Sequence, residues 1–262
     1  MIIPANSASA SGYAVDNSCR YFSNTSMTMT PSGSPTNADK NTLSIWIKIA
    51  GLGTNRSPIF ANSNGGGVHF RTDDSIDFYN AGGSLRTTQV FRDISAWYHL
   101  VFRTDTTDGT ADDRLKVYVN GVEVTSFSAR TNPTQNTDSK LGSAAEHRIG
   151  ANNSPANFFN GYMSEITFID GQALDATSFG EFDEDSGIWK PIDVSGLTFG
   201  TNGFYLDFKN SGALGADVSG NSNNFAVTNL TAIDQSTDTC TNNFATMNPL
   251  DNFYAGGTFA EG

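Results

Sequence analysis

The chain has 262 residues, of which 37% are hydrophobic and 11% aromatic, a composition that supplies one sizeable core. Acidic residues outnumber basic residues by 27 to 15, and because phosphate binding relies on Lys and Arg, we expect no nucleic-acid partner. No apolar run approaches the ~20 residues that span a bilayer, so we expect no membrane insertion, and the apolar run at 1–3 is too short for a signal peptide.

Period-two alternation of apolar residues recurs along the chain and predicts strands. In the first clear segment, 43–49, Trp46 and Lys48 lie on one face. The opposite face carries Leu43, Ile45, Ile47 and Ile49. Three shorter strands are predicted next, at 68–70, 75–79 and 85–91.

The segment 97–102 is apolar on both faces, which is typical of a central strand covered on both sides. Two alternating runs then flank Asn120-Gly121 within 114–127, the strongest short signal for a hairpin. Strands at 147–150 and 162–170 follow. Asp175 can cap a short helix through 176–182, although Gly180 limits its length.

Many short strands at this spacing predict an all-β, antiparallel sandwich. After one further strand at 203–208 the alternation fades. We therefore divide the chain into a sandwich, 1–190, and a closing strand with an extended, irregular C-terminal arm, 191–262. Cys19 and Cys240 are either two free thiols or a disulfide that ties the N-terminal strand to this arm.

Four short motifs occur in order along the predicted strands: Trp-x-His at 97–99, Tyr-Val-Asn-Gly at 118–121, Ile-Gly at 149–150 and Phe-x-Gly-x-x-x-Glu at 159–165, with Ala-Leu at 173–174. In this order and spacing, residues 40–175 resemble the laminin G-like, concanavalin A-like lectin/glucanase superfamily. The resemblance implies a jelly-roll sandwich. A second, narrower resemblance rests on the segments at 84–99, 168–189 and 200–225. Together they are similar to structural proteins of phages and marine viruses, including tail-fibre and head-decoration proteins.

Hydrolases of this superfamily often carry paired acids on one strand, as in Glu-x-Asp-x-x-Glu. The chain has no such run: Glu165 is alone on its strand, where we expect an edge or surface carboxylate, and 183–187 is expected to be a solvated loop. The three histidines lie in separate strands, and His99 is expected in the core or on a sheet surface. We therefore expect no enzymatic activity.

Laminin G-like modules often hold a calcium ion at the rim of the sandwich, and Ca²⁺ prefers several oxygen ligands. Two clusters offer them. The alternative is that these residues hydrogen-bond their own turns. The clusters are Asp105, Asp108, Asp112 and Asp113, and then Asp217, Asn221 and Asn223.

Glycan binding needs exposed aromatic rings beside polar groups. The candidates are Tyr79 and Asn80 before one turn, and Phe158 and Phe159 after another; the same rings could instead pack in the core or against another subunit.

Taken together, the sequence and the resemblance predict a non-enzymatic virion structural or adhesion protein: a phage fibre, appendage or capsid decoration. We expect a homo-oligomer, with a trimer favoured, that contacts other virion proteins and takes host-surface glycans as candidate ligands. The expected location is the virion, assembled in the host cytoplasm. A secreted carbohydrate-binding module in an extracellular location is the alternative, and a polysaccharide hydrolase or lyase is the weakest.

Overall fold

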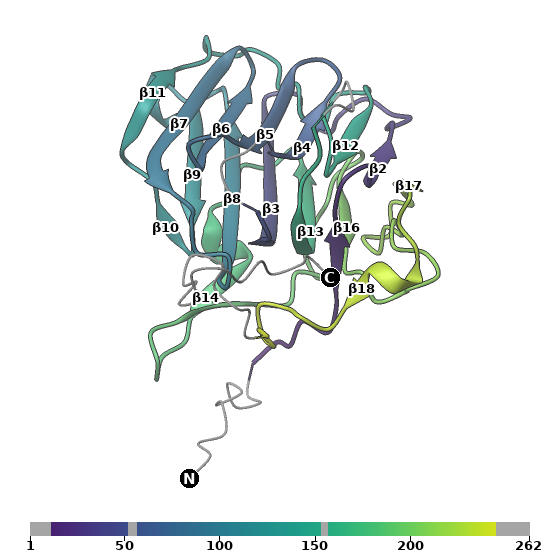
Figure 1. Cartoon of the computed structure of the whole chain (residues 1–262). Coiled ribbons are helices and arrows are strands. Elements are labelled where there is room, and N and C mark those ends of the chain that lie inside the picture. Colours follow the sequence, from purple (N-terminus) through teal and green to yellow (C-terminus); the bar gives the residue numbers. More distant parts are fainter. Residues whose placement is uncertain (1–11, 52–56, 153–156, 245–262) are drawn as a thin grey trace.

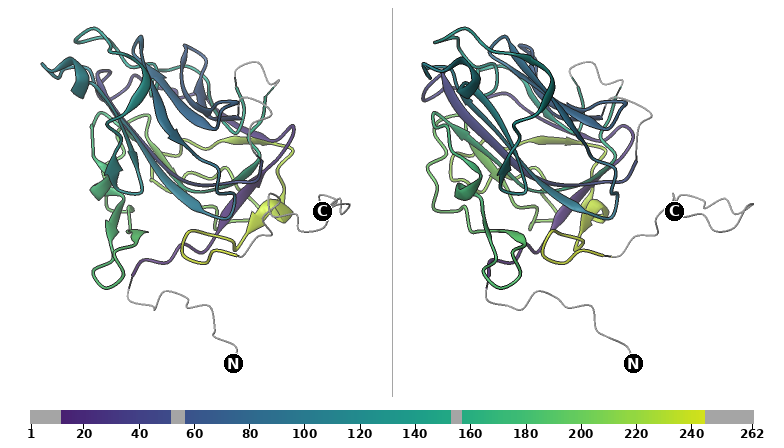
Figure 2. Two further views of the ribbon diagram at one scale, coloured as in Figure 1. Left: turned by 60° about the vertical axis from the view of Figure 1, so that its left-hand side comes forward. Right: turned by 90° about the vertical axis from the view of Figure 1, so that its left-hand side faces the viewer.

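The computed structural model describes residues 12–51, 57–152 and 157–244, and within them two eight-stranded sheets lie face to face (Figures 1 and 2). The first sheet runs in the order β10 (Val122–Glu123), β9 (Leu115–Val119), β8 (Trp97–Asp105), β3 (Lys40–Ile49), β13 (Gly161–Asp170), β1 (Ser18–Tyr21) and β18 (Gln235–Ser236), and β16 (Phe204–Leu206) also pairs with β13. The second runs β11 (Phe127–Thr131), β7 (Gly83–Val90), β6 (Ser75–Asn80), β5 (Gly66–Phe70), β4 (Ser57–Asn62), β12 (His147–Ile149), β2 (Ser26–Met29) and β17 (Ala226–Thr228).

A small third sheet and three single-turn 3-10 helices complete the described part. The sheet pairs β14 (Gly180–Phe182) with β15 (Trp189–Pro191). The helices are η1 (Ala111–Asp113), η2 (Ala176–Ser178) and η3 (Ala232–Asp234). Every strand pairing described is antiparallel, which confirms the predicted all-β antiparallel sandwich.

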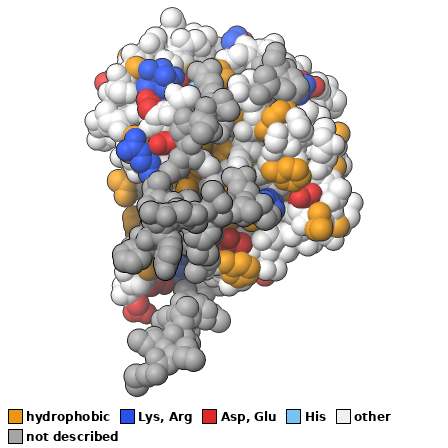
Figure 3. Space-filling view, viewed as in Figure 1, with side chains coloured by type: hydrophobic (Ala, Val, Ile, Leu, Met, Phe, Trp, Pro, Cys, Tyr) orange, Lys and Arg blue, Asp and Glu red, His pale blue; other side chains and the backbone are white. Residues whose placement is uncertain are grey.

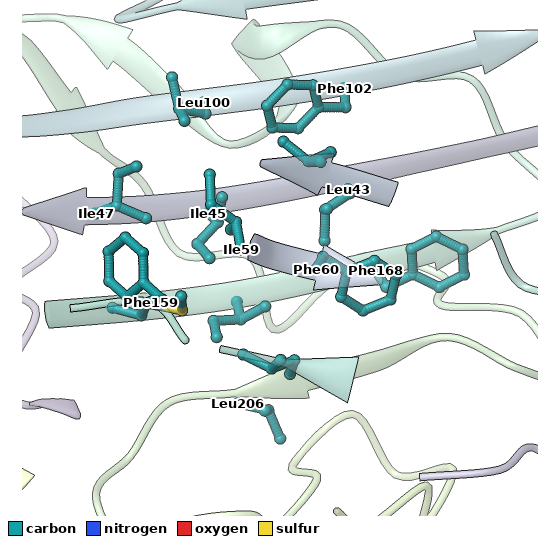
Figure 4. Packing of buried hydrophobic residues seen from close by; sticks show 14 of the residues in the cluster. Leu43, Ile45, Ile47, Ile59, Phe60, Leu100, Phe102, Phe159, Phe168 and Leu206 are labelled. Atoms are coloured by element: carbon teal, nitrogen blue, oxygen red, sulfur yellow. The ribbon is translucent and has the colours of Figure 1, made fainter. Parts of the chain in front are cut away.

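The main core fills the space between the sheets. Alternation on β3 and β8 sends every second side chain inward, as the sequence predicts. Figure 4 shows these inner faces together with Phe60, which comes from β4 of the second sheet and stacks on Phe168 of the first with ring centroids 6.1 Å apart. The labelled core residues include Leu43, Ile45, Ile47, Leu100 and Phe102, all buried.

A second hydrophobic cluster covers the outer face of the first sheet. The sheet supplies the rings of Trp46, Trp97 and Tyr205. The segment 171–200, which holds η2, β14 and β15, packs against them; it contributes Ala176, Phe179, Trp189, Val194 and Phe199. This cover explains why β8 is apolar on both faces, and it confirms the predicted two-sided burial.

The hairpin at Asn120-Gly121 is confirmed, with φ of 47° and 80° at its two residues. Its second strand is short, because the chain leaves the first sheet after Glu123 and joins the second as β11. The predicted helix after Asp175 is the single turn η2: the Asp175 carboxylate accepts a hydrogen bond from the Thr177 amide at 3.0 Å, and Gly180 already begins β14.

Residues 191–244 contribute β16 and β18 to the first sheet and β17 to the second. The rest of the predicted arm, 245–262, lies outside the described residues, and the division at residue 190 stays a prediction. Cys19 packs in the main core and Cys240 against the outer cluster. Both are free thiols, so of the two alternatives the structure has the free thiols and not the disulfide.

Candidate functional site

A polar pocket of about 350 Å³ opens on the outer face of the first sheet, beside the segment that covers the rest of that face. Strands β8 and β9 form its floor, and η1 and the chain after β13 form its walls. It is lined by Arg103, Asp108, Asp113, Lys116, Tyr118, Ala173 and Asp175. A larger hollow lies among residues 211–232, but its lining carries no charged side chain, so we place the candidate site at the polar pocket.

Strand alternation explains how these side chains meet. On β9, Leu115 and Val117 point into the core, so Lys116 and Tyr118 between them point outward. On β8, Phe102 points inward and Arg103 outward. These outward positions follow from the alternation in the sequence. Of the residues that line the pocket, Asp108 and Asp113 were predicted site residues, as calcium ligands, and the others were not, because the pocket needs a wall from the chain after β13.

Arg103 holds the pocket together. Its Nε donates to the carbonyl of Ala173 at 3.2 Å, and its Nη1 donates to the carbonyl of Asp113 at 3.0 Å. A third nitrogen lies 3.5 Å from the carboxylate of Asp105. One guanidinium therefore fixes the chain after β13 against η1, and its planar set of donors suits this task.

The acidic residues of the pocket are polarised by their neighbours. Lys116 Nζ lies 2.9 Å from Asp113 Oδ1, and this contact lowers the pKa of Asp113 and raises that of Lys116. Asp108 and Asp175 each use one carboxylate oxygen, Oδ1, to accept hydrogen bonds from their own turns. Among the described residues the second oxygen of each has no hydrogen-bond donor, so both can accept from a ligand.

Tyr118 adds an aromatic ring to this polar set. The ring is half-buried beside the outer cluster, and burial raises the pKa of its phenol, so the hydroxyl stays protonated at neutral pH. A half-buried tyrosine offers an apolar face and a polar tip. A ring flanked by carboxylates and an ammonium can thus hold a ligand that combines hydroxyl groups with an apolar C–H face.

The first predicted calcium cluster is divided among basic partners. Asp105 lies 3.1 Å from Lys40 Nζ, and Asp112 lies 3.3 Å from Arg130 Nε. Within residues 12–51, 57–152 and 157–244, no three His, Cys, Asp or Glu side chains come close enough to hold a metal ion together. The hydrogen bond of Asp105 to the Thr107 amide fits the turn alternative. A rim calcium stays a prediction.

The second predicted calcium cluster forms a hydrogen-bonded loop. Asp217 accepts from the amides of Tyr205 and Asn223, at 2.9 and 2.8 Å. The side-chain amides of Asn221 and Asn223 both donate to the carbonyl of Gly203. These contacts pin the loop to β16, which again fits the turn alternative.

Two of the four predicted glycan contacts are wrong. Asn80 is 1% exposed, and its amide donates inside the sandwich to Thr104 and Ser139, at 2.9 and 2.8 Å. Phe159 is fully buried in the main core. Both positions alternate inward, which a loop-edge interpretation overlooked.

The other two predicted glycan contacts, Tyr79 and Phe158, are half-buried. Tyr79 lies on the outer face of the second sheet, 5.5 Å from the ring of His69 and on the opposite side of the sandwich from the polar pocket. Phe158 forms an isolated bridge with Ala151. The structure therefore does not bring them to the pocket, and as glycan contacts they stay predictions.

His99 lies in the outer cluster, as expected, and its contacts settle which ring nitrogen carries the proton. Its Nδ1 accepts from Trp189 Nε1 at 2.9 Å, so the proton is on Nε2, which donates to Ser44 Oγ at 2.8 Å. Burial lowers the pKa of His99 to about 3. In this arrangement the imidazole cannot take a proton from Ser44.

Glu165 corrects our expectation of a surface carboxylate. It is 5% exposed, has a φ of +49° and lies where the register of β13 against β3 shifts, between Ser164 and Thr167. Its Oε2 accepts from the hydroxyls of Tyr205 and Tyr13, at 2.6 and 3.1 Å, and its buried Oε1 has no hydrogen-bond partner within the part of the chain that the structure describes. Burial raises its pKa to about 7.

The fold is a two-sheet antiparallel β-sandwich. Residues 22–178 match the concanavalin A-like lectin/glucanases superfamily, and the chain belongs to it. The expected resemblance to this superfamily is confirmed, and with it the concanavalin A-like jelly roll; the similarity to structural proteins of phages stays a prediction. No curated protein sequence matches the chain.

Among solved structures, a protein of Bacteroides ovatus described as a candidate carbohydrate-binding protein is similar at 16% identity and a TM-score of 0.59. The match covers 82% of this chain and 58% of that one, so the chain spans little more than half of its length. A heptameric pentraxin of Limulus polyphemus is 15% identical, with a TM-score of 0.43 over 61% of this chain and 78% of that one. Domains LG4-5 of mouse laminin α1 are 14% identical, with a TM-score of 0.43 over 64% and 45%. At these identities the likeness concerns the fold.

Proposed function

We propose that the chain is a non-enzymatic carbohydrate-binding module that serves as a structural and adhesion protein of a virion. The observation that carries the binding role is the polar pocket, which Tyr118 lines together with Lys116, Asp108 and Asp175. The superfamily match supports a lectin-like role for this fold. The virion setting rests on the similarity of the flanking segments to phage structural proteins.

A sugar ring suits this pocket chemically. Its hydroxyls can donate to the second oxygens of Asp108 and Asp175 and accept from Lys116, while its C–H face lies on the ring of Tyr118. Since the pocket is open and shallow, we expect weak binding of a single site, strengthened when several copies bind together. Self-association, with a trimer favoured, would supply those copies.

The surface fits such assembly. On the face shown in Figure 3, hydrophobic and charged side chains are scattered, and most of the described surface belongs to neither kind. Only 16% of all residues are charged. Neutral polar surfaces pack against each other through hydrogen bonds and bridging waters.

The binding role is tested with a glycan array, followed by titration of the sugars that bind. Tyr118→Ala should abolish binding without loss of the folded state, measured by thermal unfolding. Tyr79→Ala makes the same change at a predicted glycan contact on the opposite sheet; with the site at the polar pocket, this variant should bind like the parent protein. Binding lost in Tyr79→Ala and kept in Tyr118→Ala would move the site to the second sheet, and an array without any bound glycan would overturn the proposal.

The virion setting is tested separately. Light scattering on a sizing column should give a homo-oligomer, and mass spectrometry of purified particles should detect the chain. A monomer that binds free sugars tightly would instead support the alternative, a secreted carbohydrate-binding module, which the fold of the Bacteroides protein favours.

A further inference from the structure

A lysine amine is buried on the outer face of the first sheet, and the proposed sugar binding does not explain its burial. Lys48, on β3, is 1% exposed. Its Nζ lies 2.8 Å from Asp238 Oδ2, 2.8 Å from Asn243 Oδ1 and 3.0 Å from the carbonyl of Phe244. A lysine amine is rarely withdrawn from water to this extent.

The acid beside it is equally enclosed. The side chain of Asp238 is 7% exposed, and its second oxygen accepts from Trp97 Nε1 at 3.1 Å. Burying both charges of an ion pair costs free energy, and apolar residues of similar volume in the same place often stabilise a fold to the same degree or more. Stability alone therefore does not explain the buried amine and acid, and we look for a chemical role for the pair.

The third member, Asn243, is held by hydrogen bonds at both ends of its side-chain amide. Its Nδ2 donates to the carbonyl of Ser95 at 2.9 Å, which turns its Oδ1 toward Lys48. The amide carbon Cγ is bonded to Oδ1 and therefore lies close to the amine. Asn243 itself is exposed, so a small leaving group can pass into solvent.

We propose that Lys48 and Asn243 form an intramolecular isopeptide bond, with Asp238 as the proton carrier. Asp238 Oδ2 takes a proton from the Lys48 ammonium, and the free amine attacks Cγ of Asn243. The C–Nδ2 bond breaks as the Nζ–Cγ bond forms. The two protons lost from Nζ end on the departing nitrogen, which leaves as ammonium, and Asp238 returns to its carboxylate form.

The bond would join β3 to the segment after β18, positions 195 residues apart in the sequence. Such a link closes a very long loop, and the constraint on the unfolded chain grows with loop length. It would fasten the segment 236–244 across the outer face of the first sheet.

Intact-mass spectrometry of the full chain tests the bond. The parent protein should be lighter than its sequence by one ammonia molecule, and trypsin should fail to cleave after Lys48 and yield the segments 41–56 and 210–262 as one linked peptide. A parent protein that keeps its full sequence mass and is cleaved after Lys48 overturns the proposal.

Three variants separate the bond from other losses of ammonia. Lys48→Arg keeps the positive charge opposite Asp238 but cannot form the amide, and Asn243→Ala keeps the ion pair but removes the carbonyl; both should show their full sequence masses. Asp238→Asn keeps the shape and should also stay unlinked. An ammonia loss that persists in Lys48→Arg would show a cyclic imide at an asparagine and refute the cross-link.

Discussion

Replacing Glu165 by glutamine should stabilise the protein at pH 8. The stabilisation relative to the parent protein should be much smaller at pH 4.5. The Glu165 carboxyl is buried, and among the described residues its hydrogen-bond donors, Tyr205 and Tyr13, both contact Oε2 and none contacts Oε1. Burial disfavours the ionised form and raises its pKa from 4.5 to about 7. Glutamine has nearly the same shape and carries no charge at any pH.

The sign and size follow from the two pKa values. The folded protein binds this proton more tightly than the unfolded chain does, so the free energy of unfolding falls as the pH rises from about 4.5 to about 7. At about 1.4 kcal/mol for each tenfold change in proton affinity, this loss is about 3 kcal/mol. Any fixed cost of the buried amide is the same at every pH, so the change with pH isolates the carboxyl.

Urea unfolding followed by tryptophan fluorescence at pH 4.5, 6, 7 and 8 measures this difference. The gap between Glu165→Gln and the parent protein should grow in favour of the variant by about 3 kcal/mol over this range. Glu184→Gln changes an exposed carboxylate and is the matched control, with no such growth expected. A gap for Glu165→Gln that stays constant from pH 4.5 to 8 would refute the buried-carboxyl reasoning.

Three further predictions concern acid, backbone and metal. His99 and His147 are buried, and their pKa values are lowered to about 3 and about 4. As the pH falls, the unfolded chain therefore binds these protons before the folded protein does, and the free energy of unfolding should fall below about pH 6.5. Urea midpoints that are flat from pH 6.5 to 4 in a Glu165→Gln background would contradict this prediction. Gly121→Ala should cost about 1–3 kcal/mol, because φ is +80° and a Cβ there meets the ring of Trp189, whereas Gly109→Ala, at an open site, should change the urea midpoint little. If a rim calcium binds, EDTA should lower the melting temperature and added Ca²⁺ restore it; a melt unchanged by both would remove the calcium prediction.

Alternation in the sequence was enough to predict the inner faces of the long strands, because a period of two leaves one solution for which side is buried. The same rule did not predict that Lys48 and Trp46 are buried. Both lie on the outer face of the first sheet and are nonetheless buried. The segment 171–200 packs against Trp46, and residues 238–244 enclose Lys48; neither segment has a repeating pattern of its own. For the same reason the sequence pointed to Asp108 and Asp113 of the pocket around Arg103 but not to the rest of its lining.

Glu165 was misplaced because we interpreted 162–170 as a regular strand. The sequence does hold a signal: the inward residues Met163, Ile166 and Phe168 are three and then two positions apart, which a strand allows only with an extra residue between the first two. Burial of Asn80 and Phe159 could also be deduced from alternation, since each follows an outward neighbour.

The edges of the two sheets limit how copies of this protein can join. β10 and β18, at the ends of the first sheet, have two residues each, and β17, at one end of the second, has three. β11, at the other end, is irregular between Phe127 and Ala129. Such short or broken borders offer few free backbone groups for a neighbouring chain to continue the sheet. Any contact between copies of this chain would therefore depend on side chains rather than on a sheet continued from one copy to the next, and growth of fibres through main-chain pairing is disfavoured.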